Sequence, residues 1–228
     1  MEQSKQLTDI SYQFQTNIKI HDNSVMTFII LKDSRYASSS CDKSIKIFNK
    51  ITYKIDITIL EHKDYVAYIY QLKDERLVSS SSDNTIKIFK IFKNSYNVEQ
   101  IIKGHSKPVK KTIELINGSL VSCSWDKTIK IWNKNKNNIY QENQKLEGNM
   151  EVDSVFEIND KEFCSISVND NHDTHEINRA VVFYKIKNSK FDIIKIINKM
   201  IITTYSSNSV KINKKIFFGW RRKKNLFY

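Results

Sequence analysis

The sequence predicts an all-β chain assembled from four-stranded antiparallel sheets. Three observations support this prediction: one polar motif returns three times at a nearly constant interval, short alternating apolar runs recur within each interval, and no segment has sustained helical periodicity. The chain has 228 residues, of which 40% are hydrophobic and 27% charged, and this is enough to bury a sizeable core. The sequence therefore predicts a folded repeat protein.

The repeated motif contains serines, an aspartate and an Ile-Lys-Ile-aromatic run. Successive aspartates lie 41 and 43 residues apart, and a histidine precedes each aspartate by 21 residues. The histidines are His21, His62 and His105, and the aspartates are Asp42, Asp83 and Asp126. Because several markers keep one register through three copies, the motif is a true internal repeat.

Each interval predicts four strands in a fixed order. An alternating run such as 66–70 follows the histidine, and a polar turn such as 73–75 ends it. A serine-rich strand then leads to the aspartate, the Ile-Lys-Ile-aromatic strand follows, and an outer strand such as 97–102 completes the unit. Four short strands in about 40–45 residues are typical of a β-propeller blade.

These residues resemble the WD-repeat β-propeller family. Gly104-His105 and Ile131-Trp132-Asn133 are close to the Gly-His and Trp-Asp pairs of that family. The two earlier copies keep the histidine, but Ile20 and Glu61 replace the glycine, and Phe48 and Phe89 replace the tryptophan. The resemblance is clear over residues 14–135 and continues weakly to about 213.

The predicted organisation is an arc of blades at residues 14–213, between an amino-terminal tail (1–13) and a basic, aromatic tail (214–228). The repeats are placed near 21–61, 62–104, 105–147 and 148–191, with a partial one at 192–213. The fourth repeat is degenerate, because Gly148 stands at the histidine position and Asn178 at the aspartate position. We therefore expect an incomplete propeller of about four to five blades, with open ends that self-associate or require further blades.

The resemblance implies that the repeated polar residues form a buried hydrogen-bond chain in each blade. The expected members are His21, Ser38 and Asp42; His62, Ser79 and Asp83; and His105, Ser122, Asp126 and Trp132. The first two chains end one link early, since phenylalanine lacks the indole N–H. A His-Ser-Asp set that recurs in three units indicates structure, because an enzyme needs its nucleophile only once. We expect no catalytic activity.

Other sequence features are weaker. His172, Asp173 and His175 lie in an expected insertion at 169–176 that suits a solvated loop better than a metal site, so no metal and no cofactor are expected. The basic run 221–224 is interpreted as a charged tail, with a nuclear address or phosphate contact as the alternative. Three cysteines without a CxxC pair indicate free thiols, and we expect a cytoplasmic or nuclear protein. No apolar stretch is long enough for membrane insertion.

The resemblance also implies that partners contact the top face, at the residue before each turn aspartate and at the third and fifth residues after each histidine. These residues are Ser24, Met26, Cys41, Tyr65, Ala67, Ser82, Pro108, Lys110 and Trp125. Trp125 is the favoured anchor, because exposed tryptophans are frequent hot spots. Packing against the neighbouring blade is the alternative for its side chain.

The sequence therefore favours a non-catalytic scaffold that binds other proteins. The net charge of +12 raises nucleic-acid or acidic-surface binding as an alternative. However, only five of the 37 basic residues are arginine, which is the residue favoured for forked phosphate and base contacts. A third interpretation is the repeat portion of a larger multidomain protein.

Overall fold

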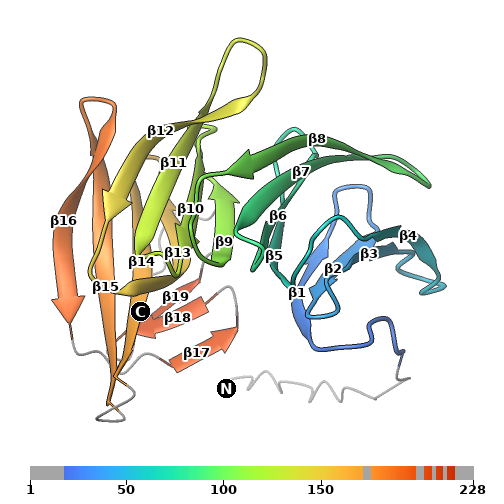
Figure 1. The fold of residues 1–228 in the computed structure, drawn as a ribbon, viewed down its shortest axis with the longest axis horizontal. Helices are drawn as coiled ribbons and strands as arrows, with labels where there is room; N and C mark the ends of the chain where they lie inside the picture. The colour runs from blue at the N-terminus through green and yellow to red at the C-terminus, as the bar shows by residue number, and fades with distance from the viewer. Residues whose placement is uncertain (1–17, 172–175, 199–202, 207–208, 213–214, 219–228) are drawn as a thin grey trace, which may run out of the picture.

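The computed structural model describes residues 18–171, 176–198, 203–206, 209–212 and 215–218. These residues form strands and turns and no helix, so the described chain holds no apolar helix that could cross a membrane. Four sheets of four antiparallel strands stand side by side in chain order, from blue to orange in Figure 1, and are called blades 1 to 4 here. The expected all-β, incomplete propeller of four to five blades is confirmed.

Each blade is a meander whose strands pair in chain order. Blade 1 contains β1 (Val25–Ile30), β2 (Tyr36–Ser40), β3 (Ile45–Phe48) and β4 (Ile55–Ile59). Blade 2 contains β5 (Val66–Gln71), β6 (Leu77–Ser81), β7 (Thr85–Ile91) and β8 (Tyr96–Lys103). Blade 3 contains β9 (Val109–Glu114), β10 (Leu120–Ser124), β11 (Thr128–Lys134) and β12 (Tyr140–Glu147). Blade 4 contains β13 (Glu151–Asn159), β14 (Glu162–Asn171), β15 (Glu176–Lys187) and β16 (Lys190–Asn198). A separate sheet contains β17 (Thr203–Ser206), β18 (Ser209–Ile212) and β19 (Lys215–Phe218).

The turns inside the blades follow from their polar residues. Ser34 and Glu75 adopt positive φ angles of 71° and 73° in the first turns of blades 1 and 2, and Gly118 adopts 87° in blade 3. The residue after each turn aspartate is also left-handed, for example Lys127 with φ of 68°. The aspartate side chain stabilises that turn, because Asp126 Oδ1 accepts the Thr128 N–H at 3.0 Å.

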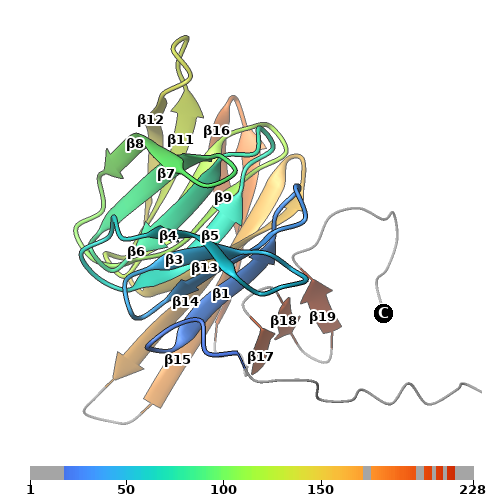
Figure 2. The same cartoon turned by 90° about the vertical axis from the view of Figure 1, so that its right-hand side faces the viewer.

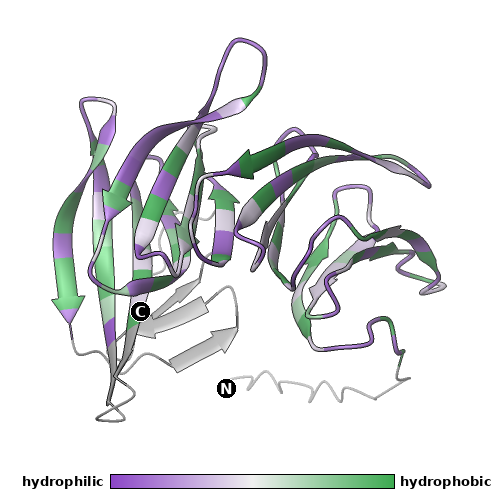
Figure 3. Ribbon diagram, in the orientation of Figure 1, coloured by the Kyte–Doolittle hydropathy of each residue, from purple (hydrophilic) through white to green (hydrophobic). Residues whose placement is uncertain are grey.

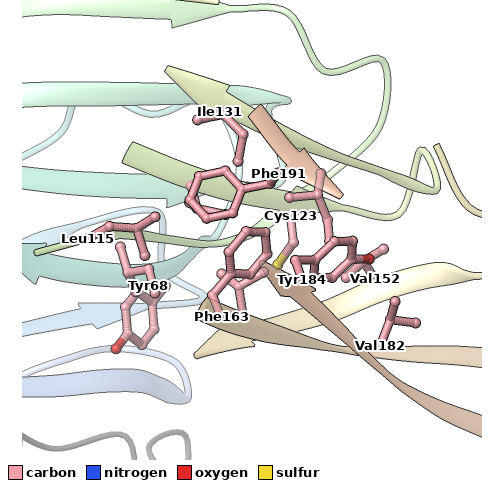
Figure 4. Close-up of a cluster of buried hydrophobic side chains, with 13 residues drawn as sticks. Tyr68, Leu115, Cys123, Ile131, Val152, Phe163, Val182, Tyr184 and Phe191 are labelled. Carbon is pink, nitrogen blue, oxygen red and sulfur yellow. The ribbon is translucent and has the colours of Figure 1, made fainter. Parts of the chain in front are cut away.

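The hydrophobic core lies between blades. The face of a blade that meets the preceding blade is called its front face here, and the opposite one its back face. Ile45 and Ile47 on the back of blade 1 pack in one cluster with Val66 and Phe89 on the front of blade 2. A second cluster joins blades 2 and 3, and a third joins blades 3 and 4 (Figure 4). Burial between neighbours therefore holds the blades together.

Figure 4 shows how the third cluster is filled. Phe163 stacks on Tyr184 with ring centroids 4.5 Å apart, and Phe191 meets Phe163 edge-on at 5.0 Å. Cys123 lies among these rings and is fully buried. The cysteines Cys41, Cys123 and Cys164 are all free.

Three details differ from the sequence prediction. The expected loop at 169–176 is partly strand, because β14 continues through Asn171 and β15 begins at Glu176, and this hairpin projects beyond the other blades in Figures 1 and 2. Blade 4 continues past residue 191, since β16 extends to Asn198. The segment expected as a tail from 214 contains β19, whose residues pair with β18. The expected tails 1–13 and 219–228 lie outside the described residues.

Candidate protein-interaction surface

The structure brings the predicted histidine, serine and aspartate together in each of the first three blades. In blade 3, His105 Nδ1 lies 2.8 Å from Asp126 Oδ2, and His105 Nε2 lies 2.8 Å from Ser122 Oγ. His21 has the same contacts with Asp42 and Ser38, and His62 has them with Asp83 and Ser79, at distances from 2.6 to 2.8 Å. The side chains expected to form a chain are therefore hydrogen-bonded.

The tautomer of His105 follows from the donors around it. The indole N–H of Trp132 can only donate, and it donates to Ser122 Oγ at 2.8 Å. Ser122 then donates its own proton to His105 Nε2, so Nδ1 carries the imidazole proton and donates to Asp126. The histidines are 6–8% exposed, and Ser122 and Ser79 are fully buried. The hydroxyls of Ser122 and Ser79 are therefore withdrawn from solvent.

The aspartates have additional donors. Asp126 also accepts the Ser106 N–H at 3.0 Å and the Thr128 hydroxyl at 2.6 Å. Burial alone would raise the pKa of Asp126. Hydrogen bonds from His105 and Thr128 lower it by more than burial raises it, so the pKa lies well below its usual value. The same balance lowers the pKa of Asp42 and Asp83. All three carboxylates therefore stay ionised at neutral pH.

The fourth blade keeps only the end of this chain. Tyr184 occupies the position of Trp132, because Trp132 pairs with Leu120, two residues before Ser122, and Tyr184 pairs with Phe163, two residues before Ser165. Its hydroxyl lies 3.2 Å from Ser165 Oγ inside the core. Gly148 replaces the histidine, which explains why the pattern in the sequence fades here although the blade still forms.

The predicted top-face residues are paired by the backbone of each blade. The residue before each turn aspartate donates its N–H to the carbonyl of the third residue after the histidine: Cys41 to Ser24, Ser82 to Tyr65, and Trp125 to Pro108, at 2.9, 3.0 and 3.1 Å. The fifth residue after each histidine sits at an irregularity in the first strand, where the register shifts by one residue. Such bulges re-aim side chains.

The three bulge residues differ in exposure. Met26 is exposed and Lys110 is half-buried. Ala67 is buried, and its carbonyl accepts the Thr27 hydroxyl of blade 1 at 3.3 Å. Ala67 therefore offers little surface to a partner, and its predicted contact with partners stays a prediction.

Trp125 is half-buried and connects two blades. Its indole N–H donates to Asp153 Oδ1 on β13 of blade 4 at 2.9 Å. Lys110 Nζ lies 4.3 Å from the Trp125 ring centroid and 5.8 Å from the ring of Tyr65 in blade 2. These cation–π contacts hold the lysine between two rings. Tyr65, Lys110, Trp125 and Asp153, the top-face cluster, therefore span three blades.

Sequence reasoning missed two sets of residues. The Ser/Thr two places after each aspartate (Ser44, Thr85 and Thr128) was visible in the repeat and completes the polar network. Asp153 was missed because the fourth repeat lacks the histidine, although it lies five residues after Gly148, at the register shift that corresponds to Lys110 in blade 3. The described residues contain no cluster of His, Cys, Asp and Glu that could hold a metal ion. The His172–His175 segment lies outside the described residues.

The comparisons with known proteins agree with this fold. A family model described as "WD domain, G-beta repeat" matches residues 12–49 and 97–133. The comparison with curated proteins gives no match. Among solved structures, the WD40 β-propeller domain of Doa1 is 26% identical, with a TM-score of 0.56 over 64% of this chain and 49% of that one.

Two further structures show the fold at lower identity. The structure of U3-55K and the RRP9 WD40 repeats are each 19% identical, with a TM-score of 0.62 over 77% of this chain. The matches cover 53% and 52% of those chains, so this chain spans about half the length of the propellers that it matches. The resemblance to WD-repeat β-propellers is confirmed, and the chain contains WD40 repeats.

Proposed function

We propose that this chain of WD40 repeats is a non-catalytic scaffold that binds another protein through the top-face cluster. The observation that carries the proposal is the stack of Tyr65, Lys110 and Trp125 across neighbouring blades. Aromatic and long basic side chains held in a fixed orientation lose little entropy when a partner binds. The buried His-Ser-Asp sets support the absence of catalysis, because their hydroxyls are withdrawn from solvent.

A peptide-display selection tests this proposal, because a random peptide library samples many partner chemistries at once. Peptides would be selected on the full chain, and their dissociation constants measured for the wild type and for Trp125→Ala. We expect at least a tenfold loss of affinity, as for a typical hot spot. Peptides that bind Trp125→Ala as tightly as the wild type would contradict the proposal.

The control is a similar lysine–aromatic pair away from the cluster. Lys90 Nζ lies 5.6 Å from the ring centroid of Phe92, which is 39% exposed. Phe92→Ala should leave peptide affinity unchanged. Equal losses for Phe92→Ala and Trp125→Ala would indicate non-specific adhesion to aromatic side chains.

Nucleic-acid binding is the second candidate, carried by the net charge of +12. Two of the described arginines argue against it: Arg35 contacts Asp33 at 2.7 Å, and Arg76 contacts Asp74 at 2.8 Å and Glu99 at 3.1 Å. These guanidinium groups are already occupied. A DNA or RNA titration at two salt concentrations separates the candidates, because phosphate contacts give a steep salt dependence.

We propose two further roles. The chain self-associates through the open ends of the arc, or it is the repeat portion of a longer protein. The coverage of about half the length of the matched propellers supports both. Neither depends on the top-face cluster.

A further inference from the structure

The front face of blade 1 is apolar, although no described element packs on it. In blade 2 the corresponding positions, Val66 and Ile69, are 0% exposed because they meet blade 1. Val25 and Phe28 occupy these positions in blade 1 and are 55% and 50% exposed. Hydrophobic residues colour parts of β1 green at the end of the arc in Figure 3. The residue types of an inter-blade core are thus present on a face that the described chain leaves open.

This face contains a groove of about 430 Å³. Its lining includes Ile18, Val25, Phe28, Tyr36, Phe48 and Tyr53. The ring centroids of Phe28 and Tyr36 are 5.0 Å apart, and those of Tyr36 and Phe48 are 5.7 Å apart. The groove is therefore floored by packed aromatic rings.

A polar connection between blades is missing at this face. Gln71, Glu114 and Glu157 lie at corresponding positions near the end of the first strand in blades 2, 3 and 4. Each accepts a backbone N–H from the turn of the preceding blade. The donors are Lys32, Lys73 and Ile116. Blade 1 has Ile30 at this position, and Ile30 is 66% exposed. A preceding blade of the same kind would find no acceptor there.

The other open end also departs from the internal pattern. Gln100 and Gln144 lie on the outer strands of blades 2 and 3. The side-chain amide of each donates to the backbone carbonyl and accepts the backbone N–H of one residue in the next blade, which is Tyr140 for Gln100 and Phe191 for Gln144. Blade 1 has Ile57 at this position, within an apolar cluster, and blade 4 has Lys195. A lysine cannot accept the N–H that glutamine accepts. Head-to-tail pairing of blade 4 with blade 1 would therefore lack both connections.

Charge favours pairing of two front faces. The chain carries +12, yet the charged side chain in the groove lining is Lys19, whose Nζ lies 3.0 Å from Asp22 Oδ1. Each copy of this face therefore contributes a single lysine, and an aspartate already balances its charge.

We propose that the front face of blade 1 binds the front face of blade 1 in a second copy, which gives a two-fold symmetric dimer. Such an interface is isologous, with the same apolar patch contributed by both partners. The inference rests on the proposed self-association and names its surface, and it does not involve the top-face cluster.

The test is the dimer dissociation constant of the full chain, measured by sedimentation velocity and light scattering over a dilution series. Phe28→Glu places a charge in the interface and should raise that constant at least tenfold. Ile194→Glu is the matched control, because Ile194 on β16 is 53% exposed at the other open end. If Phe28→Glu loses its cooperative thermal melt, Ile30→Glu replaces it, since Ile30 is more exposed.

The outcomes distinguish the symmetric pairing of front faces from self-association in general. Dimers weakened by Phe28→Glu or Ile30→Glu, and not by Ile194→Glu, support the symmetric pairing. Dimers weakened equally at both ends overturn the symmetric pairing and leave self-association standing, because head-to-tail contact uses both ends. A wild-type chain that is monomeric at every concentration overturns both.

Discussion

Gly104 and Trp132 lie in such close contact that a β-carbon at position 104 would be 2.7 Å from Cη2 of the indole. In blades 1 and 2 the residues corresponding to Gly104 are Ile20 and Glu61, and their aromatic partners are the smaller Phe48 and Phe89. The glycine and the tryptophan are thus present together or replaced together. The space available for a side chain at position 104 therefore depends on the size of the aromatic ring at position 132.

This relationship predicts coupling between two substitutions. Gly104→Ala should destabilise the wild type by about 1–3 kcal/mol, because the indole is buried and bonded to Ser122 and cannot easily move. In a Trp132→Phe background the same substitution should cost less than about 0.5 kcal/mol, since the smaller ring leaves room for the methyl group. Urea unfolding of the four proteins measures the coupling, and equal costs in both backgrounds would contradict it.

Asp126 and His105 should also behave as one unit. Asp126→Ala removes the acceptor for His105, Ser106 and Thr128, and should cost about 1–3 kcal/mol. His105→Ala should cost a similar amount, and the double variant should cost less than the sum, because both substitutions break the same contact. Thermal melts of the single and double variants test this. Additive losses would indicate separate interactions.

Trp125 tests whether the top-face cluster contributes to stability. An exposed anchor would leave the free energy of unfolding within about 0.5–1 kcal/mol in Trp125→Ala, whereas a core residue would cost about 3–5 kcal/mol. Because Trp125 is half-buried and bonded to Asp153, we expect a loss of about 1–2 kcal/mol. Asp153→Ala should reproduce part of that loss. A loss above about 3 kcal/mol in Trp125→Ala would show that the residue is core and not a binding anchor.

Lys111 should make stability depend on pH. Its Nζ lies 3.9 Å from the ring centroid of Phe156 and 4.9 Å from that of Tyr68, and burial lowers its pKa from 10.5 to about 8. Between these values the unfolded chain binds more protons than the folded one, so the free energy of unfolding rises with pH. Burial raises the pKa of Cys123 and Cys164 from 9.0 to about 12, which has the opposite effect above pH 9. The rise due to Lys111 should therefore be clearest between pH 8 and 9.

Lys111→Met should remove that rise and stabilise the protein at pH 7 by about 1–3 kcal/mol. Urea unfolding at pH 7, 8 and 9 measures both effects. Lys110→Met is the control, because Lys110 is the adjacent lysine in the sequence and its side chain is only half-buried. An unchanged pH profile in Lys111→Met would show that this ammonium group is not responsible.

The repeat pattern predicted the blades because each repeat contains its own four strands and its own turn aspartate. It predicted the contacts of His105 for the same reason, since the partners recur at fixed distances. It could not predict that Asp153 meets Trp125, because this contact joins a regular blade to a degenerate one. The burial of Ala67 escaped for a different reason: Met26 and Lys110 lie at the same register shift with longer side chains, and their positions in the repeat did not indicate that Ala67 would be buried.

The acceptors Gln71, Glu114 and Glu157 all act in one direction, from the first strand of a blade to the turn before it. Loss of blade 4 would leave the backbone N–H of Ile116 without its acceptor, whereas loss of blade 1 would remove the Lys32 donor and leave the acceptor Gln71 in place. The stability of a repeat protein is approximately the sum of the stabilities of its repeats and of the interfaces between neighbouring repeats. This asymmetry between the interfaces therefore sets the order in which the blades unfold. Fraying that begins at the fourth blade weakens the third, and cooperativity therefore spreads toward the amino terminus.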